Sequence, residues 1–292
     1  MRIGIFLNIV GTLAHGPVWG EEVIAQGLKE YLSLQPSVEF VECFGTQGDP
    51  SIADAPNDFD VVVHCAPLLP MEYSKTNVIM YEISDMYRDG GIHYYDRYDW
   101  CFSYGRTFSA WNDRSSWFPP PVDTYVFDRV QSDEYDCDVF FAGNTHGCGL
   151  EENIIQPAVD ACSNALIFGC LGNSPLPAHL LPRLYSSGKI GINRHHPDHI
   201  YFDMWNNRTV ELLSCGAFVI SDAVPVEQEV FGDSIVISTG GDDLRDKIKY
   251  YLENPAERYS RAQKGRDIVR AQFSTKDASE RMLARLSCIL GA

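Results

Sequence analysis

The 292-residue sequence has few basic residues and no long apolar run. It holds 23 Lys and Arg against 40 Asp and Glu, which gives a formal net charge of −17. Nucleic acids and anionic membrane surfaces both select basic proteins, so neither is an expected partner. No stretch is long enough to span a bilayer, and the apolar run before Gly11 is too short for a signal peptide. We therefore expect no stable membrane insertion.

The nine cysteines are odd in number and include no CxxC pair. They are scattered among apolar segments, which favours reduced core thiols in a cytoplasmic protein. No GxGxxG motif follows an apolar segment, which disfavours an NAD enzyme. Pro17 and Val18 stand where a P-loop needs Lys and Ser or Thr, which disfavours an NTPase.

Apolar segments alternate with amphipathic helical patterns along most of the chain. This alternation indicates parallel sheets covered on both faces, and therefore an α/β fold. In the first part of the chain we expect a helix over 20–32 and strands over 3–9, 38–44, 60–65, 78–83 and 100–104.

The pattern restarts after the prolines at 119–121 and the acidic segment 128–136. We therefore expect a first domain over 1–132, a second over 133–275, and a C-terminal helix within 276–292. The second part predicts strands over 137–142, 165–170, 190–193, 217–221 and 234–238. It predicts helices over 151–162, 177–186, 204–215, 242–253, 255–272 and 276–290.

The most informative segment is NNRTVELLSCGAFVISD, residues 206–222. Arg208 and Glu211 are three residues apart and share a helix face, and Gly216 can end that helix before a short interior strand. The start of the helix then lies near the carboxyl edge of a sheet, where ligands of open α/β folds bind. A guanidinium suits a diphosphate and a carboxylate suits ribose hydroxyls. The alternative is a surface ion pair between these two side chains.

The same segment resembles the C-terminal signature of glycosyltransferases of the GT-B type, since ELLSCGAFVISD follows the pattern EAMACG-PVI-S. Retaining members carry two acids separated by seven residues, as Asp203 and Glu211 are. With Asn207 and Arg208 ahead of the helical run, the segment is similar to the group 1, spore-maturation-type (CgeB-like) members. FPPPVDTYVF at 118–127 and LYSSGKIGINRHHPD at 184–198 extend the resemblance.

The resemblance implies two Rossmann-like domains with a cleft between them and a C-terminal helix that crosses back to the first domain. It implies transfer of a hexosyl group from a nucleoside-diphosphate sugar, which is a substrate, so no cofactor is expected. The implied course is retaining and metal-independent, and the acceptor is a small molecule, a glycan or a protein. We expect a monomer or homodimer. The alternatives are a sugar-nucleotide epimerase and a catalytically degenerate binding or partner module of the same fold.

Candidate site residues come from this segment, from turns after predicted strands, and from loops of the first domain. The turn at Gly143 and Asn144 would let backbone amides approach a phosphate, or is an ordinary strand exit. The resemblance places His15 in the first loop and Glu82 near the transferred sugar. For donor binding the candidates are Gly11, Gly143, Asn144, Arg194, Asn207, Arg208, Thr209 and Glu211. For catalysis they are Arg208, Asp203, His15 and Glu82.

Two of these features have structural alternatives. Asp203 is equally well explained as the N-cap of the helix that carries Arg208. The histidines His195, His196 and His199 suggest zinc, but Pro197 would break a helix aligning the first and last, and no cysteine is close in sequence. We therefore expect no metal site.

Overall fold

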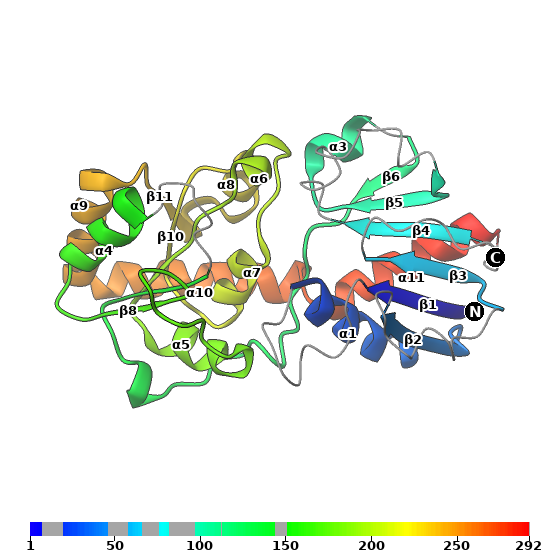
Figure 1. Cartoon of the computed structure of the whole chain (residues 1–292), viewed down its shortest axis with the longest axis horizontal. Helices are drawn as coiled ribbons and strands as arrows, with labels where there is room; N and C mark the ends of the chain where they lie inside the picture. Colours follow the sequence, from blue (N-terminus) through cyan, green and yellow to red (C-terminus); the bar gives the residue numbers. More distant parts are fainter. Residues whose placement is uncertain are drawn as a thin grey trace. The chain divides into compact units, whose positions relative to one another are not determined.

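The computed structural model describes residues 1–7, 20–45, 58–65, 76–81, 97–111, 113–143 and 151–291. The chain divides into two compact units, each with one parallel sheet and its helices (Figure 1). The first unit comprises Met1–Asp123, Phe202–Met204 and Ser274–Ala292, and the second comprises Thr124–Tyr201 and Trp205–Phe273. The predicted α/β class is confirmed.

Among the described residues the first sheet has six strands, and every neighbouring pair is parallel. Val61, Val62 and Val63 have no exposed surface, as expected where helices cover both faces of a sheet. The edge strand β6 was not predicted, because two of its three residues are serines and it is only half-buried. The order is β2 (Phe40–Gly45), β1 (Arg2–Leu7), β3 (Val61–His64), β4 (Thr76–Tyr81), β5 (Trp100–Ser103) and β6 (Ser115–Trp117).

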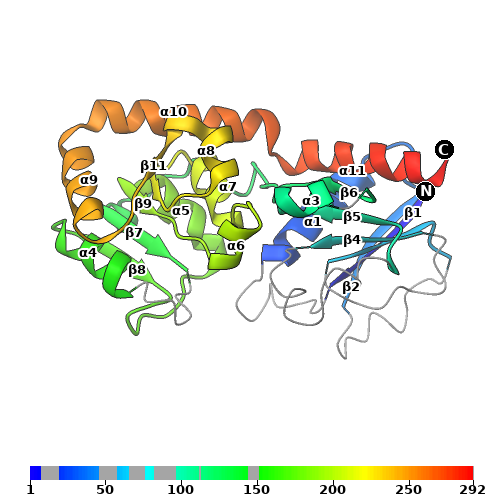
Figure 2. The same cartoon turned by 90° about the horizontal axis from the view of Figure 1, so that it is seen from above.

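The C-terminal helix packs in the first unit, where it lies against α1 and along the sheet (Figure 2, red). A Cβ at Gly27 would lie 3.0 Å from Thr275 Cγ2, so glycine permits the close approach of the two helices. Ala278, Met282 and Leu286 are fully buried in the first core. This confirms the packing implied by the family resemblance. In the described ranges of this unit the helices are α1 (Gly20–Ser33), α3 (Arg106–Trp111) and α11 (Thr275–Leu290).

The second sheet has five parallel strands. Its central strands are short and apolar, and all three residues of β9 and of β10 are buried. Each lies within a segment predicted as a strand. The order across the sheet is β11 (Ile235–Ile237), β10 (Val219–Ser221), β9 (Ile190–Ile192), β7 (Val139–Ala142) and β8 (Ala165–Phe168).

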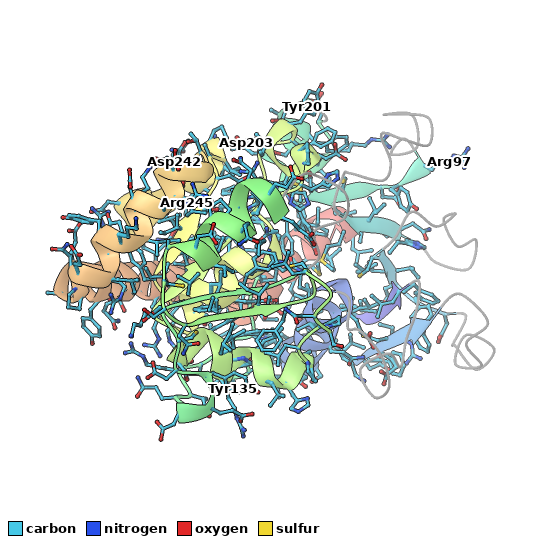
Figure 3. The ribbon with its side chains drawn as sticks, turned by 60° about the vertical axis from the view of Figure 1, so that its left-hand side comes forward. Arg97, Tyr135, Tyr201, Asp203, Asp242 and Arg245 are labelled. Carbon is cyan, nitrogen blue, oxygen red and sulfur yellow. The ribbon has the colours of Figure 1, made fainter. Side chains whose placement is uncertain are left out.

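Helices of the second unit pack closely where glycine allows it. A Cβ at Gly265 of α10 would lie 2.6 Å from Leu213 Cδ2 of α7, and these helices contact each other. Asp242 and Arg245 on α9, labelled in Figure 3, form an exposed ion pair. The α-helices are α4 (Gln156–Asp160), α5 (Leu181–Ser187), α6 (Pro197–Tyr201), α7 (Asn207–Ser214), α8 (Pro225–Phe231), α9 (Gly241–Glu253) and α10 (Pro255–Gln272). The 3-10 helices are η4 (Asp133–Tyr135), η6 (Ala178–Leu180) and η7 (Gly232–Ser234), and η5 (Glu151–Ile155) is a π-helix.

The second unit begins at Thr124, ahead of the boundary predicted between 132 and 133. Hydrogen bonds explain this position. The Val130 N–H donates to Ser186 Oγ at 3.0 Å, and the Ser132 N–H donates to Ser187 Oγ at 2.8 Å. The acidic segment is therefore held by α5 of the second unit, although its composition is that of a linker.

Every cysteine among the described residues is a free thiol, and all but Cys162 and Cys288 are buried. Burial raises the pKa of Cys43 to about 12. Such thiols stay protonated and act as small apolar side chains, in agreement with the interpretation of their scattered positions.

Candidate functional site

The strand order of the second sheet reverses between β7 and β9. The chain goes from β7 outward to β8, then returns to the other side of β7 with β9, β10 and β11. In open α/β sheets ligands bind at such a switch point, at the carboxyl ends of the strands. Gly143 follows β7, and Asn193 and Arg194 follow β9. These three residues therefore stand where the topology favours a ligand.

The start of α7 is tied to the end of β9. The N-cap of α7 is Asn206, whose Oδ1 accepts a hydrogen bond from the Thr209 N–H at 3.1 Å. Its Nδ2 donates to Asn193 Oδ1 at 3.2 Å and to the Arg194 carbonyl at 2.9 Å. The interpretation of Asp203 as the cap is wrong, because the helix begins later than its apolar pattern suggests and Asn206 satisfies its free amides.

Arg208, on the first turn of α7, reaches the switch point. Its guanidinium carbon lies 5.1 Å from the centroid of the Phe141 ring, and Nη1 stands 3.5 Å from Asn193 Oδ1. A Cβ at Gly143 would lie 2.1 Å from Nη2, so this glycine leaves the space that the guanidinium occupies. Within the part of the chain that the structure describes, no carboxylate forms an ion pair with Arg208. Its charge is therefore available to an anionic ligand.

Glu211 lies on the next turn of α7 and is half-buried. Burial raises the pKa of its carboxyl to about 7, although the positive charge of Arg208 opposes the shift. Among the described residues its carboxylate has no hydrogen-bond or ion-pair partner, so the mutual ion pair with Arg208 is not formed. A poorly solvated carboxylate without a partner, close to a cation without a counter-charge, is typical of a ligand site.

We expect Glu211→Gln to stabilise the ligand-free protein at high pH. Because the folded state holds the Glu211 proton more tightly than the unfolded chain, stability is lost as pH rises from 4.5 to about 7. Glutamine removes this loss, so the melting temperature should rise at pH 8 and change little at pH 4.5. Thermal melts at both pH values measure the difference. A lower melting temperature at both would mean that the carboxylate holds the fold together.

Arg194 and Thr209, both predicted to bind the donor, differ in exposure. Arg194 keeps 26% of its side chain exposed, and its Nε stands 3.4 Å from Asp222 Oδ2. Thr209 has no exposed surface, and its hydroxyl donates to Glu227 Oε1 at 2.7 Å. The Thr209 side chain therefore anchors α7 and does not face a ligand. Sequence reasoning missed Asp222 and Glu227. The one signal for Asp222 was its place directly after a strand, and Glu227, inside α8, gave none.

Asp203 belongs to the first unit, in the segment Phe202–Met204 (Asp203 is labelled in Figure 3). Its φ of 54° is in the left-handed region that few residues other than glycine adopt. Its Oδ2 accepts a hydrogen bond from Arg106 Nε at 2.7 Å, and its carbonyl accepts from the Arg106 N–H at 3.2 Å. Asp203 thus helps to cap α3, and a catalytic contact by it stays a prediction.

The remaining candidates add little to the site. Asn207, the first residue of α7, is half-buried. His195 and His199 have ring centroids 6.0 Å apart, and Pro197 begins α6 instead of breaking a helix. In the described ranges no group of three or more His, Cys, Asp or Glu is arranged to hold a metal ion. The candidates that fall outside the described residues are Gly11, His15, Glu82 and Asn144.

The residues of this site lie in a region with known relatives. Residues 151–284 match a family described as glycosyl transferase-like, a range that includes Arg194, Arg208 and Glu211. Spore protein CgeB of Bacillus subtilis (strain 168) is 29% identical over 130 residues, which are 41% of this chain. The match spans 37% of the length of CgeB.

Solved structures that match nearly all of the chain share its fold. Sucrose-phosphate synthase (tll1590) from Thermosynechococcus elongatus has a TM-score of 0.74 at 12% identity, over 100% of both chains. Anabaena Alr3699/HepE in complex with UDP and glucose has a TM-score of 0.71 at 11% identity, over 98% of this chain and 99% of that one. The chain therefore has the fold of GT-B glycosyltransferases.

The signature segment lies where the resemblance predicted it. Arg208 and Glu211 lie on α7, and α7 leads to the buried strand β10 at the centre of the second unit. Among the described residues, no helix is long and apolar enough to cross a membrane.

Proposed function

We propose that this protein is a glycosyltransferase that moves a hexosyl group from a nucleoside-diphosphate sugar, bound by the second unit, to an acceptor hydroxyl. One observation carries the proposal. The Arg208 guanidinium lies at the switch point of the second sheet with no ion-pair partner among the described residues. A diphosphate supplies the missing counter-charge, and its oxygens match the fork of N–H donors on a guanidinium.

Arg208 and Arg194 also suit the chemical step. When the anomeric C–O bond breaks, its electron pair stays on the departing diphosphate, and groups that stabilise that growing charge lower the barrier. Arg208 is placed to do so, and Arg194, partly exposed after β9, is the second candidate. Two guanidinium groups can supply the positive charge without a divalent ion, so we propose a metal-independent reaction.

Glu211 would bind the other end of the nucleotide. It shares a helix face with Arg208 and its carboxylate has no partner among the described residues. Ribose offers two hydroxyl donors, and a carboxylate accepts hydrogen bonds from both. One helix then binds the diphosphate and the ribose of the same donor.

We propose that the anomeric configuration is retained. In this course the acceptor oxygen bonds to the anomeric carbon from the face that the diphosphate leaves, and the acceptor proton passes to a leaving phosphate oxygen. No protein base is required, unlike an inverting attack, which needs one. The acid spacing of Asp203 and Glu211, typical of retaining members, supports the proposal.

Structural neighbours suggest uridine diphosphate sugars as the first donors to try. HepE was solved with UDP and glucose, and an α-glucosyltransferase with a TM-score of 0.61 at 13% identity was solved with UDP-glucose and DNA. For this chain we propose a small-molecule, glycan or protein acceptor. Buried free thiols favour a reducing compartment, so we propose a cytoplasmic enzyme.

A thermal-shift panel of UDP, GDP, ADP and dTDP tests the proposal. A ligand at about 100 times its Kd stabilises the native state by about 2.7 kcal/mol, which raises the melting temperature by several degrees. We expect one diphosphate to do so and its nucleoside to do much less. If none of the four diphosphates moves the melting temperature at millimolar concentration, the donor site is not where we place it.

A further inference from the structure

Four polar side chains are buried together at the carboxyl edge of the second sheet, and we call them the buried polar cluster. The side chains of His195 and Glu227 are 0% exposed, that of Asp222 is 5% exposed, and Thr209 has no exposed surface. They come from the turns after β9 and β10 and from α7 and α8. Burying ionisable groups opposes folding, and apolar residues of similar volume often serve stability equally well. Burial of these four side chains therefore points to a role other than stability.

The cluster is a continuous series of polar contacts. His195 Nδ1 lies 2.7 Å from Asp222 Oδ1, and the His195 N–H also donates to Asp222 Oδ1 at 3.1 Å. On its other side, His195 Nε2 lies 3.4 Å from Thr209 Oγ1 and 3.5 Å from Glu227 Oε1. Asn193 Nδ2 donates to Thr209 Oγ1 at 2.9 Å. The contacts therefore join the end of β9, the end of β10, and α7.

Each proposed phosphate-binding arginine immediately precedes a member of the cluster. Arg194 is followed by His195, and Arg208 is followed by Thr209. The buried partners fix the backbone from which each arginine extends. Arg194 has a second restraint, because its Nε lies 3.4 Å from Asp222 Oδ2.

The pKa shifts of the two acids in the cluster agree with an ion pair between Asp222 and Arg194. Burial opposes ionisation of Asp222, but the hydrogen bond and charge of His195 and the charge of Arg194 outweigh it, so the pKa of Asp222 lies below its usual value. Burial raises the pKa of Glu227, and the charge of His195 and the Thr209 hydrogen bond oppose that shift. The two shifts therefore favour ionisation of Asp222, the acid beside Arg194, over ionisation of Glu227.

We infer that Asp222 and His195 are positioning residues: Asp222 holds the Arg194 guanidinium toward the donor diphosphate, and His195 holds Asp222. The inference rests on the proposed function and extends it, since it makes Arg194 effective through a carboxylate that never touches the donor. It predicts that substitution of Asp222 weakens binding of the diphosphate only while Arg194 is present.

A double-mutant cycle on the full chain tests this, with the Kd of UDP measured by calorimetry. Asp222→Asn keeps the shape and can still accept the His195 N–H, but it loses the charge beside Arg194. Loss of this partly buried ion pair should raise Kd about tenfold, equivalent to about 1.4 kcal/mol, when Arg194 is present. In an Arg194→Ala background, the same substitution should change Kd less than about twofold. The matched control is Asp160→Asn, in the exposed pair with Arg245, where no change is expected.

Each result has one meaning. A rise in Kd of equal size in both backgrounds, or no rise in either, overturns the inference. Arg208→Ala is measured beside the cycle. If it and Arg194→Ala both leave UDP binding unchanged, the proposed function itself fails. Should Asp222→Asn not fold, His195→Asn and His195→Leu replace it. Asparagine keeps a hydrogen-bond donor for Asp222, so His195→Asn should preserve the Kd of UDP. His195→Leu should raise Kd, again only with Arg194 present. Equal effects of the two substitutions would overturn the inference.

Discussion

Arg208→Ala should lower the rate of donor turnover by about 100- to 1000-fold, the usual effect of removing one group that stabilises a developing oxyanion. The guanidinium lies at the switch point with its charge uncompensated by any described carboxylate, so its loss removes the cation that we propose binds the diphosphate. Release of UDP from UDP-glucose, with water as acceptor if no other is known, measures the rate. The melting temperature without ligand should change little, because no ion pair is lost.

Two further substitutions make the Arg208 result specific. Arg208→Lys keeps the charge but loses the planar fork of donors, so its turnover should lie between those of the wild type and the alanine variant. Arg245→Ala, which removes a partly exposed arginine that pairs with Asp242 on α9, should leave turnover unchanged. Wild-type turnover by Arg208→Ala would show that the diphosphate is bound elsewhere.

Gly143→Ala should have an effect close to that of Arg208→Ala, although the added methyl group touches no ligand. Its Cβ would lie 2.1 Å from Arg208 Nη2 and 2.7 Å from the guanidinium carbon, so the guanidinium must leave its position beside Phe141. The end of a flexible side chain can move without unfolding the protein. We therefore expect a large loss of UDP affinity with a nearly unchanged melting temperature.

The same substitution in the Arg208→Ala background is its best control. Alanine at position 208 cannot meet the new methyl group, so Gly143→Ala should then cost almost nothing further in UDP affinity. A further loss of similar size would show that the backbone at Gly143 acts on the donor directly, as the sequence-based hypothesis of a phosphate-binding turn proposed.

The signature segment could be predicted because its structure is set by local chemistry. Gly216 has a φ of 76°, and its N–H bonds to the Leu213 carbonyl at 2.9 Å, so it ends α7 as predicted. The apolar run after it forms β10. Since a helix that precedes such a strand must begin near the carboxyl edge of the sheet, Arg208 was placed correctly without any tertiary information.

The start of α7 could not be predicted in the same way. Met204 and Trp205 continue the apolar pattern of the helix, but they are buried in the segment that precedes it. Asp203 and Asn206 are both good capping residues, and only the position of the backbone distinguishes them. In the structure Asn206 caps the helix, whereas Asp203 accepts a hydrogen bond from Arg106, nearly a hundred positions away in the sequence.

The buried polar cluster could not be predicted from the sequence, for a different reason. Asp222 and Glu227 are acids in a sequence rich in acids, and the default expectation for an acid is solvent. Their burial depends on where the ends of β9 and β10 meet α7 and α8. No sequence pattern within a single segment indicates where these strand ends and helices contact one another.

The segment Phe202–Met204 has a practical consequence for separating the two units. It belongs to the first unit but lies within the sequence range of the second, so cleavage after 123 and after 273 does not separate the units cleanly. A fragment spanning 124–273 would carry Phe202 and Met204, both buried in the first core, into water. Such a fragment would be prone to aggregate unless those two side chains were replaced by polar ones.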